Sequence, residues 1–186
     1  PGHARKERVL ESSTHFASRY SRHQAHTANT NKQSAMVKSN IPPDPGISLC
    51  RRLSSAKTPA EYFGAWLELQ CVTLDIDSGV LVLEDRSQRR FTPVARWPRS
   101  EKPLDPQLAG AAERVLREAK TIVIHDDQSA SGDLFIAFPI RAGGPESPVQ
   151  GVVAARTRTA GEGPEARAQT VVRGLDWGCT CLLYTS

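Results

Sequence analysis

Two groups of acidic and histidine side chains are the first candidates for chemistry in this chain. Asp75 and Asp77 stand two residues apart in the sequence DIDSG, and two carboxylates at this spacing suit a divalent cation or the nucleophile and acid of an aspartate phosphotransferase. Such an enzyme also needs a lysine and a second acidic loop after parallel strands, which the sequence does not show. We therefore interpret the pair as turn residues before a strand.

The second candidate is the sequence His125-Asp126-Asp127, which follows the apolar run 121–124. A histidine beside two carboxylates suits a general base, a metal ligand or a haem ligand. The segment opens a polar loop, expected over 125–132, and loops at strand ends often carry binding groups. No Ser or Cys nucleophile with a convincing motif accompanies it, and Gly143-Gly144-Pro145 is a hairpin tip rather than a phosphate-binding loop. The sequence favours an exposed polar loop, with a binding loop as the functional alternative.

Arginine and cysteine residues complete the inventory. Arg96 and Arg99 follow a predicted strand and are candidates for an anion contact, with solvated side chains as the alternative. The four cysteines show neither disulfide-framework nor zinc-finger spacing, and they are Cys50, Cys71, Cys179 and Cys181. This cysteine usage favours a reducing, cytoplasmic setting. Cys71 is expected to be a small buried apolar side chain, and no cofactor is indicated.

Charge divides the chain of 186 residues into two parts. Residues 1–57 hold ten Lys and Arg against three Asp and Glu, a net charge of +7, whereas residues 58–186 hold 14 against 17, a net charge of −3. The sequence pI of 9.1 thus belongs to the leader, so it does not indicate a nucleic-acid partner for the domain. No run of 18 apolar residues is present, which excludes a membrane-spanning helix within this sequence.

The leader over 1–46 is rich in polar and basic residues and has no apolar period, so we expect it to be disordered, ending in the stiff linker IPPDPG. Met36 is the only methionine, and it is an alternative start. The leader contains four histidines, which are His3, His15, His23 and His26. We interpret them as solvent-exposed residues of a disordered segment, and a metal-binding role is the functional alternative.

Capping signals and apolar runs predict the elements of a domain over 47–178. Thr58-Pro59-Ala60-Glu61 is a capping box that opens a helix to about Cys71, and Asp105-Pro106 opens another. Apolar runs predict strands at 80–83, 91–97, 121–124, 134–140 and 149–155, and a last helix is expected over 164–177. Short hairpin connections make the sheet mainly antiparallel. The last two strands are apolar at nearly every position, so helices should cover both faces of an α+β fold.

The order and residues of these elements resemble a GAF domain over about 57–178. The matching pieces are TPAEYFGAWLELQC, GVLVLED, FTPVARWP, AAERVLREAK with TIVI, FIAFPIR with GVVAAR, and VVRGLDWG. The resemblance is strongest to GAF domains at the cytoplasmic N-terminus of bacterial HlyD-type membrane-fusion (periplasmic adaptor) secretion proteins. It implies a mainly antiparallel sheet of five to six strands flanked by helices. It also implies a membrane span and an adaptor region farther along a full-length protein.

The resemblance implies a non-catalytic regulatory domain that binds a small molecule or forms a homodimer through its terminal helices. The implied ligand pocket lies near the polar loop and the following strand, which gives the candidate binding residues His125, Asp126, Asp127, Phe135, Phe138 and Arg96. The Asn-Lys-x-Phe-Asp-Glu signature of cyclic-nucleotide GAF domains is absent. A docking module without a ligand, attached to a signalling protein, is the alternative.

The resemblance stops at Gly178, after which the chain continues as CTCLLYTS. The string CLLYTS resembles a translated sequencing-adapter fragment, so we expect 179–186 to be a non-native tail and the last helix to be truncated. A thiolate metal or redox pair at Cys179 and Cys181 is the functional alternative.

Overall fold

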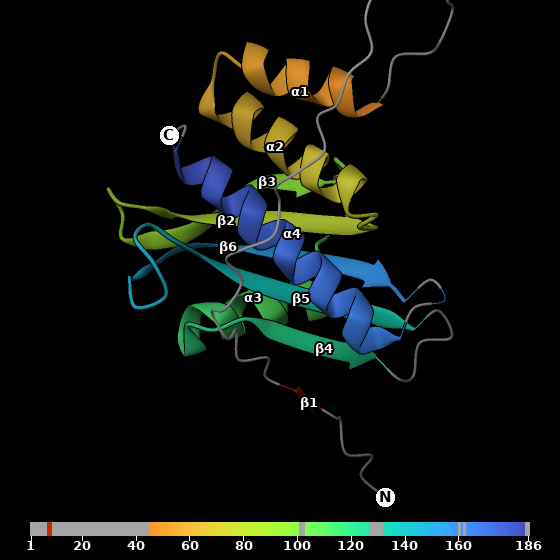
Figure 1. Cartoon of the computed structure of the whole chain (residues 1–186). Helices are drawn as coiled ribbons and strands as arrows, with labels where there is room; N and C mark the ends of the chain where they lie inside the picture. Colours follow the sequence, from red (N-terminus) through yellow and green to blue (C-terminus); the bar gives the residue numbers. More distant parts are fainter. Residues whose placement is uncertain are drawn as a thin grey trace, which may run out of the picture.

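The computed structural model describes residues 7–8, 45–100, 103–126, 132–159, 161 and 163–184 of the chain. Figure 1 shows a central sheet with helices on both of its faces. The helices are α1 (Pro45–Ser55), α2 (Pro59–Thr73), α3 (Pro106–Glu118) and α4 (Pro164–Tyr184). The strands are β1 (Glu7–Arg8), β2 (Ser78–Asp85), β3 (Arg90–Trp97), β4 (Ile122–Asp126), β5 (Asp133–Arg141) and β6 (Val149–Arg158).

The predicted capping signals start two helices as expected. At α2, the Glu61 backbone N–H donates to the Thr58 hydroxyl over 3.2 Å, and the Glu61 carboxylate accepts from the Thr58 backbone N–H. At α3, the Asp105 carboxylate accepts from the Gln107 backbone N–H over 2.9 Å. Each cap satisfies a backbone donor that the first helical turn leaves without a partner.

The strands form one sheet in the order β1-β4-β5-β6-β2-β3, and every pairing is antiparallel. The hairpins β2–β3, β4–β5 and β5–β6 join neighbours in the sequence, as the short connections predict. The pairing of β6 with β2 joins two strands that are not neighbours in the sequence, with Val153 opposite Leu81. The α+β fold class and the antiparallel sheet are therefore confirmed.

Each face of the sheet has its own core. On one face, α2 and α4 cover Leu81, Ile136 and Val153. On the other, α3 covers Val80, Phe135 and several alanines. Alternate residues of the continuously apolar strands β5 and β6 therefore enter two different cores. This confirms that the near-absence of polar residues in these strands reflects helices on both sides.

The structure differs from the expected elements in several places. Helix α1 begins at Pro45 and was not expected, and β4 continues through Asp126, so His125 and Asp126 belong to a strand rather than to a loop. Residues 7–8 form the edge strand β1; most of the leader, including its histidines, lies outside the described residues, so its expected disorder stays a prediction.

The last helix is longer than the expected 164–177. Helix α4 runs to Tyr184, and both Cys179 and Leu182 are buried against the core under α2. Trp66 is only 1% exposed and donates its indole N–H to the Gly178 carbonyl over 3.1 Å. Residues 179–184 thus extend α4 in this structure; their resemblance to adapter sequence concerns their origin and stays a prediction.

Within the described residues, no helix combines the length and apolarity needed to cross a membrane.

Candidate functional site

The apolar core under α3 ends in a polar region near the N-terminus of that helix. Along β6, Ala154 belongs to this core, and Arg156 lies two residues farther on the same face, opposite Phe135 of β5. Two residues along the strands from Phe135, Asp133 of β5 is the backbone register partner of Asp126 on β4 and of Arg158 on β6. Charged residues from three strands therefore gather at one end of the α3 face.

Arg156 is a charged group of this region that has one buried donor without an acceptor. Its Nη1 lies 3.6 Å from an oxygen of Asp105, the residue that caps α3. Its Nε is buried and donates to no acceptor. A buried N–H without an acceptor is costly, by about 1–3 kcal/mol, so this atom marks a place where an acceptor from a bound molecule or a water would be stabilising.

Two of the predicted binding residues join Arg156 on this face. Asp126 accepts a hydrogen bond from the Gln107 side-chain amide over 3.0 Å, which ties the end of β4 to the first turn of α3. Arg96 of β3 lies opposite Val80 of β2 in the strand register, and Val80 belongs to the α3 core. The Arg96 side chain donates to the Pro103 carbonyl over 2.9 Å. Gln107, Asp105 and Arg156 were not among the predicted site residues; the helix-capping motif at Asp105 is the sequence signal that points toward them.

The other predicted residues do not converge on this region. His125 alternates with Ile124 and Asp126, so it faces the opposite side of the sheet, as does Phe138, which packs against the α2–α4 core. Phe135 is on the α3 face but is buried in its core. Asp127 lies outside the described residues. The strand alternation therefore prevents Phe135 and Phe138 from lining one pocket.

Asp75 and Asp77 have structural roles, which supports their interpretation as turn residues. The Asp75 backbone adopts φ 51°, and its carbonyl accepts from Arg167 over 2.7 Å and from the Thr157 hydroxyl over 3.0 Å. The Asp77 carboxylate binds the Arg158 guanidinium through two hydrogen bonds of 2.7 and 3.1 Å.

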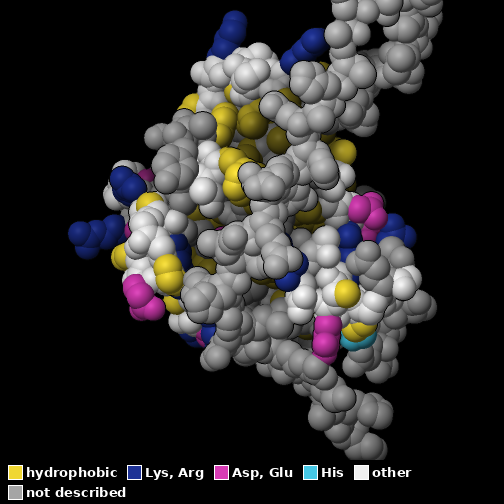
Figure 2. Space-filling view, in the orientation of Figure 1, with side chains coloured by type: hydrophobic (Ala, Val, Ile, Leu, Met, Phe, Trp, Pro, Cys, Tyr) yellow, Lys and Arg dark blue, Asp and Glu magenta, His cyan; other side chains and the backbone are white. Residues whose placement is uncertain are grey.

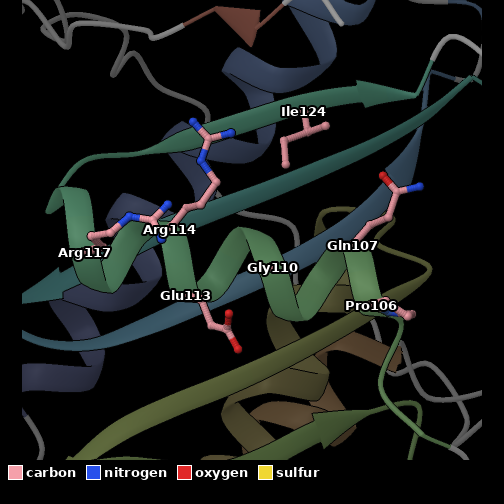
Figure 3. A pocket seen from close by; sticks show the side chains of 7 residues that line it. All are labelled: Pro106, Gln107, Gly110, Glu113, Arg114, Arg117 and Ile124. Atoms are coloured by element: carbon pink, nitrogen blue, oxygen red, sulfur yellow. The ribbon is translucent and has the colours of Figure 1, made fainter.

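A hollow of about 490 Å³ lies between α3 and β4 (Figure 3). Figure 3 shows the Arg114 side chain reaching from α3 toward β4, while the Glu113 side chain points away from β4.

Near the C-terminal end of α3, Glu118 accepts a hydrogen bond from Arg114 over 3.2 Å and lies within 3.6 Å of Arg117 and 3.5 Å of Lys120. The hydrogen bond from Arg114 is the main cause that lowers the pKa of the Glu118 carboxyl.

A second hollow, of about 150 Å³, lies on the other face, between α2, the two hairpin ends and α4. Its apolar lining residues are Phe63, Leu83, Ile140 and Leu182, and its polar ones are Glu84, Arg86 and Gln150. Neither hollow is lined by Phe135 or Phe138.

The four cysteines separate into two exposed and two buried thiols. Burial raises the pKa of Cys71 to about 12, and it also raises the pKa of Cys179.

We expect a maleimide at neutral pH to label Cys50 and Cys181 rapidly in the folded protein, and all four cysteines in urea, because only the thiolate reacts and it must be accessible. Mass spectrometry of the labelled peptides measures this. Equal labelling of Cys179 and Cys181 in the native protein would contradict the position of α4.

Within the described residues, no group of three or more His, Cys, Asp or Glu side chains is arranged to hold a metal ion.

No protein-family model matches the chain, and no curated protein matches it. Several solved structures do. The GAF domain of A. aeolicus nlh2, crystallised in an inactive state, is 18% identical with a TM-score of 0.51, and the match covers 75% of this chain and 94% of that one. The GAF domain of a phosphoenolpyruvate-protein phosphotransferase from Acinetobacter is 14% identical, with a TM-score of 0.44 and coverage of 80% and 98%. That of Coxiella burnetii is 12% identical, with a TM-score of 0.49 and coverage of 75% and 90%. The similarity to the A. aeolicus domain shows that this chain has the GAF fold.

Proposed function

We propose that this domain is a non-catalytic regulatory module that binds a small polar molecule at the charged end of the α3 face. The observation that carries the proposal is the buried Nε of Arg156, which has no acceptor. Arg96 and Gln107 add further donors near the same end of α3, and Asp105 and Asp126 add acceptors. A mixed set of this kind suits a small molecule that carries a carboxylate beside a donor group.

The test is a thermal-unfolding screen of the full chain against small mono- and dicarboxylates and amino acids. A compound that binds only the folded state at about 100 times its Kd adds about 2.7 kcal/mol to the free energy of unfolding. We expect Arg156→Gln to abolish the stabilisation given by the best compound. The matched control Arg173→Gln, on the exposed side of α4, should retain it. A compound that stabilises both variants equally binds elsewhere and contradicts the site.

A second candidate function, docking of a second copy through the terminal helices, is favoured by Trp177. This side chain is 74% exposed on α4, although tryptophan is highly buried on average in folded proteins. Helices α2 and α4 pack side by side, and Figure 2 shows hydrophobic side chains gathered over the region of α1 and α2. A homodimer through this helical layer would cover the indole.

Light scattering on gel-filtered protein tests this docking function. If Trp177 is buried in a homodimer, Trp177→Ala should raise the dissociation constant of the dimer on the order of 30-fold, as expected for a central aromatic contact. The exposed Thr180→Ala, one turn along α4, is the control and should leave the dimer intact. A monomeric wild-type chain at high concentration would exclude this second function.

For the wider context, we propose that the domain regulates a membrane-attached secretion adaptor of the HlyD type from the cytoplasmic side. The support is the resemblance of its sequence pieces to the N-terminal GAF domains of such proteins. The reading frame of the native gene tests this proposal: a membrane span and an adaptor region beyond the domain would support it, and a kinase or cyclase module there would replace it.

A further inference from the structure

The smaller hollow, of about 150 Å³, is built from parts of the chain that are far apart in the sequence. Beneath it, Gly151 of β6 lies in register between Leu83 of β2 and Ile140 of β5. A Cβ atom on Gly151 would come within 2.5 Å of a Leu83 methyl carbon and 3.5 Å of an Ile140 methyl carbon, so these two side chains close over the glycine. Phe63 of α2 and Leu182 of α4 add apolar walls. The hollow therefore lies where two helices meet three strands of the sheet.

The apolar walls of this hollow have room for one further side chain. Ile140 and Leu182 are buried, whereas Phe63 and Leu83 pack against the same core and stay only half-buried. A cavity of about 150 Å³ lined by Leu, Ile and Phe side chains holds one benzene ring. A single branched or aromatic group placed here would remove apolar surface of Phe63 and Leu83 from water.

Three polar side chains of different charge line the same hollow, namely Glu84, Arg86 and Gln150. Within the part of the chain that the structure describes, none of their side chains forms a hydrogen bond or an ion pair. The carboxylate of the neighbouring Asp85, in contrast, accepts from the backbone N–H and the hydroxyl of Ser87. Glu84 offers acceptors for an ammonium group, and Arg86 offers donors for a carboxylate. An apolar slot beside one anion and one cation matches a zwitterion that carries an apolar side chain.

We propose that this hollow binds one free α-amino acid with a branched or aromatic apolar side chain, such as leucine or phenylalanine. The amino acid places its side chain between Phe63 and Leu83, its ammonium group against Glu84 and its carboxylate against Arg86. The hollow belongs to the α2–α4 face of the sheet and shares no residue with the charged end of the α3 face, so the two sites are independent. A bound amino acid would contact α2, α4 and both hairpins at once.

Equilibrium dialysis of the full chain against radiolabelled L-leucine and L-phenylalanine tests this site. We expect one molecule bound per chain. Arg86→Gln and Glu84→Gln should each weaken the binding about tenfold, because each variant loses a charge-assisted hydrogen bond to the ligand. Both side chains are exposed, so neither variant should disturb the fold. Arg90→Gln is the matched control, since Arg90 is exposed in the same hairpin but does not line the hollow, and it should bind like the wild type.

Leucine analogues that compete with the labelled amino acid assign the two charged ends. Leucinamide lacks the carboxylate, so Arg86→Gln should not change its affinity. N-acetyl-leucine lacks the ammonium group, so Glu84→Gln should not change its affinity. Glycine lacks the apolar side chain and should not compete.

The outcomes separate this site from the one at Arg156. Arg156→Gln should bind leucine as the wild type does. Loss of leucine binding in Arg156→Gln, with unchanged binding in Arg86→Gln, would place the amino acid on the α3 face; it would overturn this site and support the proposed function. A wild-type chain that binds neither leucine nor phenylalanine overturns the proposal, and so does equal leucine binding by the wild type, Arg86→Gln and Glu84→Gln.

Discussion

Replacement of Arg167 by Ala is expected to lower the free energy of unfolding by about 3 kcal/mol, because a charged donor is removed from several buried acceptors at once. Arg167 is on α4 and is 8% exposed. Its Nη2 donates to the Leu74 carbonyl over 2.6 Å and to the Asp75 carbonyl over 2.7 Å, and its Nε donates to the Thr157 hydroxyl over 3.2 Å. One guanidinium therefore connects α4, the turn after α2 and the end of β6.

The expected cost is large because the acceptors are fixed by other parts of the fold. Asp75 has a positive φ that presents its carbonyl toward Arg167, and Thr157 has no exposed surface. Without the arginine, these buried oxygens lose donors that water cannot easily replace, at about 1–3 kcal/mol for a buried group. Arg167→Lys, which keeps the charge but donates from a single nitrogen, should recover part of the loss.

Urea unfolding followed by circular dichroism measures the effect of Arg167→Ala. The midpoint should fall by about 1.5 M at a slope typical for a domain of this size. Arg173→Ala is the matched control, since Arg173 is on the same helix but exposed, and its change should stay within about 0.5 kcal/mol. Equal midpoints for the two variants would show that the network contributes little.

Local sequence signals predicted the elements of this fold more reliably than their ends. The capping box at Thr58 is readable because all its contacts lie within four residues, and the hairpins follow from short connections. The end of α4 depends instead on tertiary packing: Cys179 and Leu182 extend the helix because α2 and the sheet bury them. Helix α1, with only one fully buried residue at Leu49, carries too weak an apolar pattern to be predicted.

The candidate site was predictable only in part, for a similar reason. Where both odd- and even-numbered positions of a strand are apolar, the sequence does not show which face each side chain occupies. Phe135 and Phe138 were therefore predicted to line one pocket, although they belong to different cores. Asp126 and Arg96 were identified because charged residues at strand ends stand out. Arg156 ends an apolar run in the same way, but its pairing with Asp105 joins residues 51 positions apart, and no local pattern records that contact.

Replacement of Gly151 by Ala is expected to destabilise the sheet by about 2 kcal/mol, because the added methyl group has no room. Gly151 lies in the central strand β6, opposite Leu83 of β2 and Ile140 of β5. A Cβ atom at this position would lie 2.6 Å from the Val82 carbonyl oxygen and 2.5 Å from a methyl carbon of Leu83. The carbonyl belongs to the backbone of a paired strand, so relief requires β2 and β6 to move apart.

Gly110→Ala is the matched control and should have the opposite sign. Gly110 is inside α3, and a Cβ there meets no atom within 4 Å. Alanine is favoured over glycine in a helix interior by about 1 kcal/mol, so this variant should be more stable than the wild type. Urea unfolding of the two variants under the same conditions separates steric from conformational effects. A Gly151→Ala protein as stable as Gly110→Ala would show that β2 and β6 are not packed as closely as the structure places them.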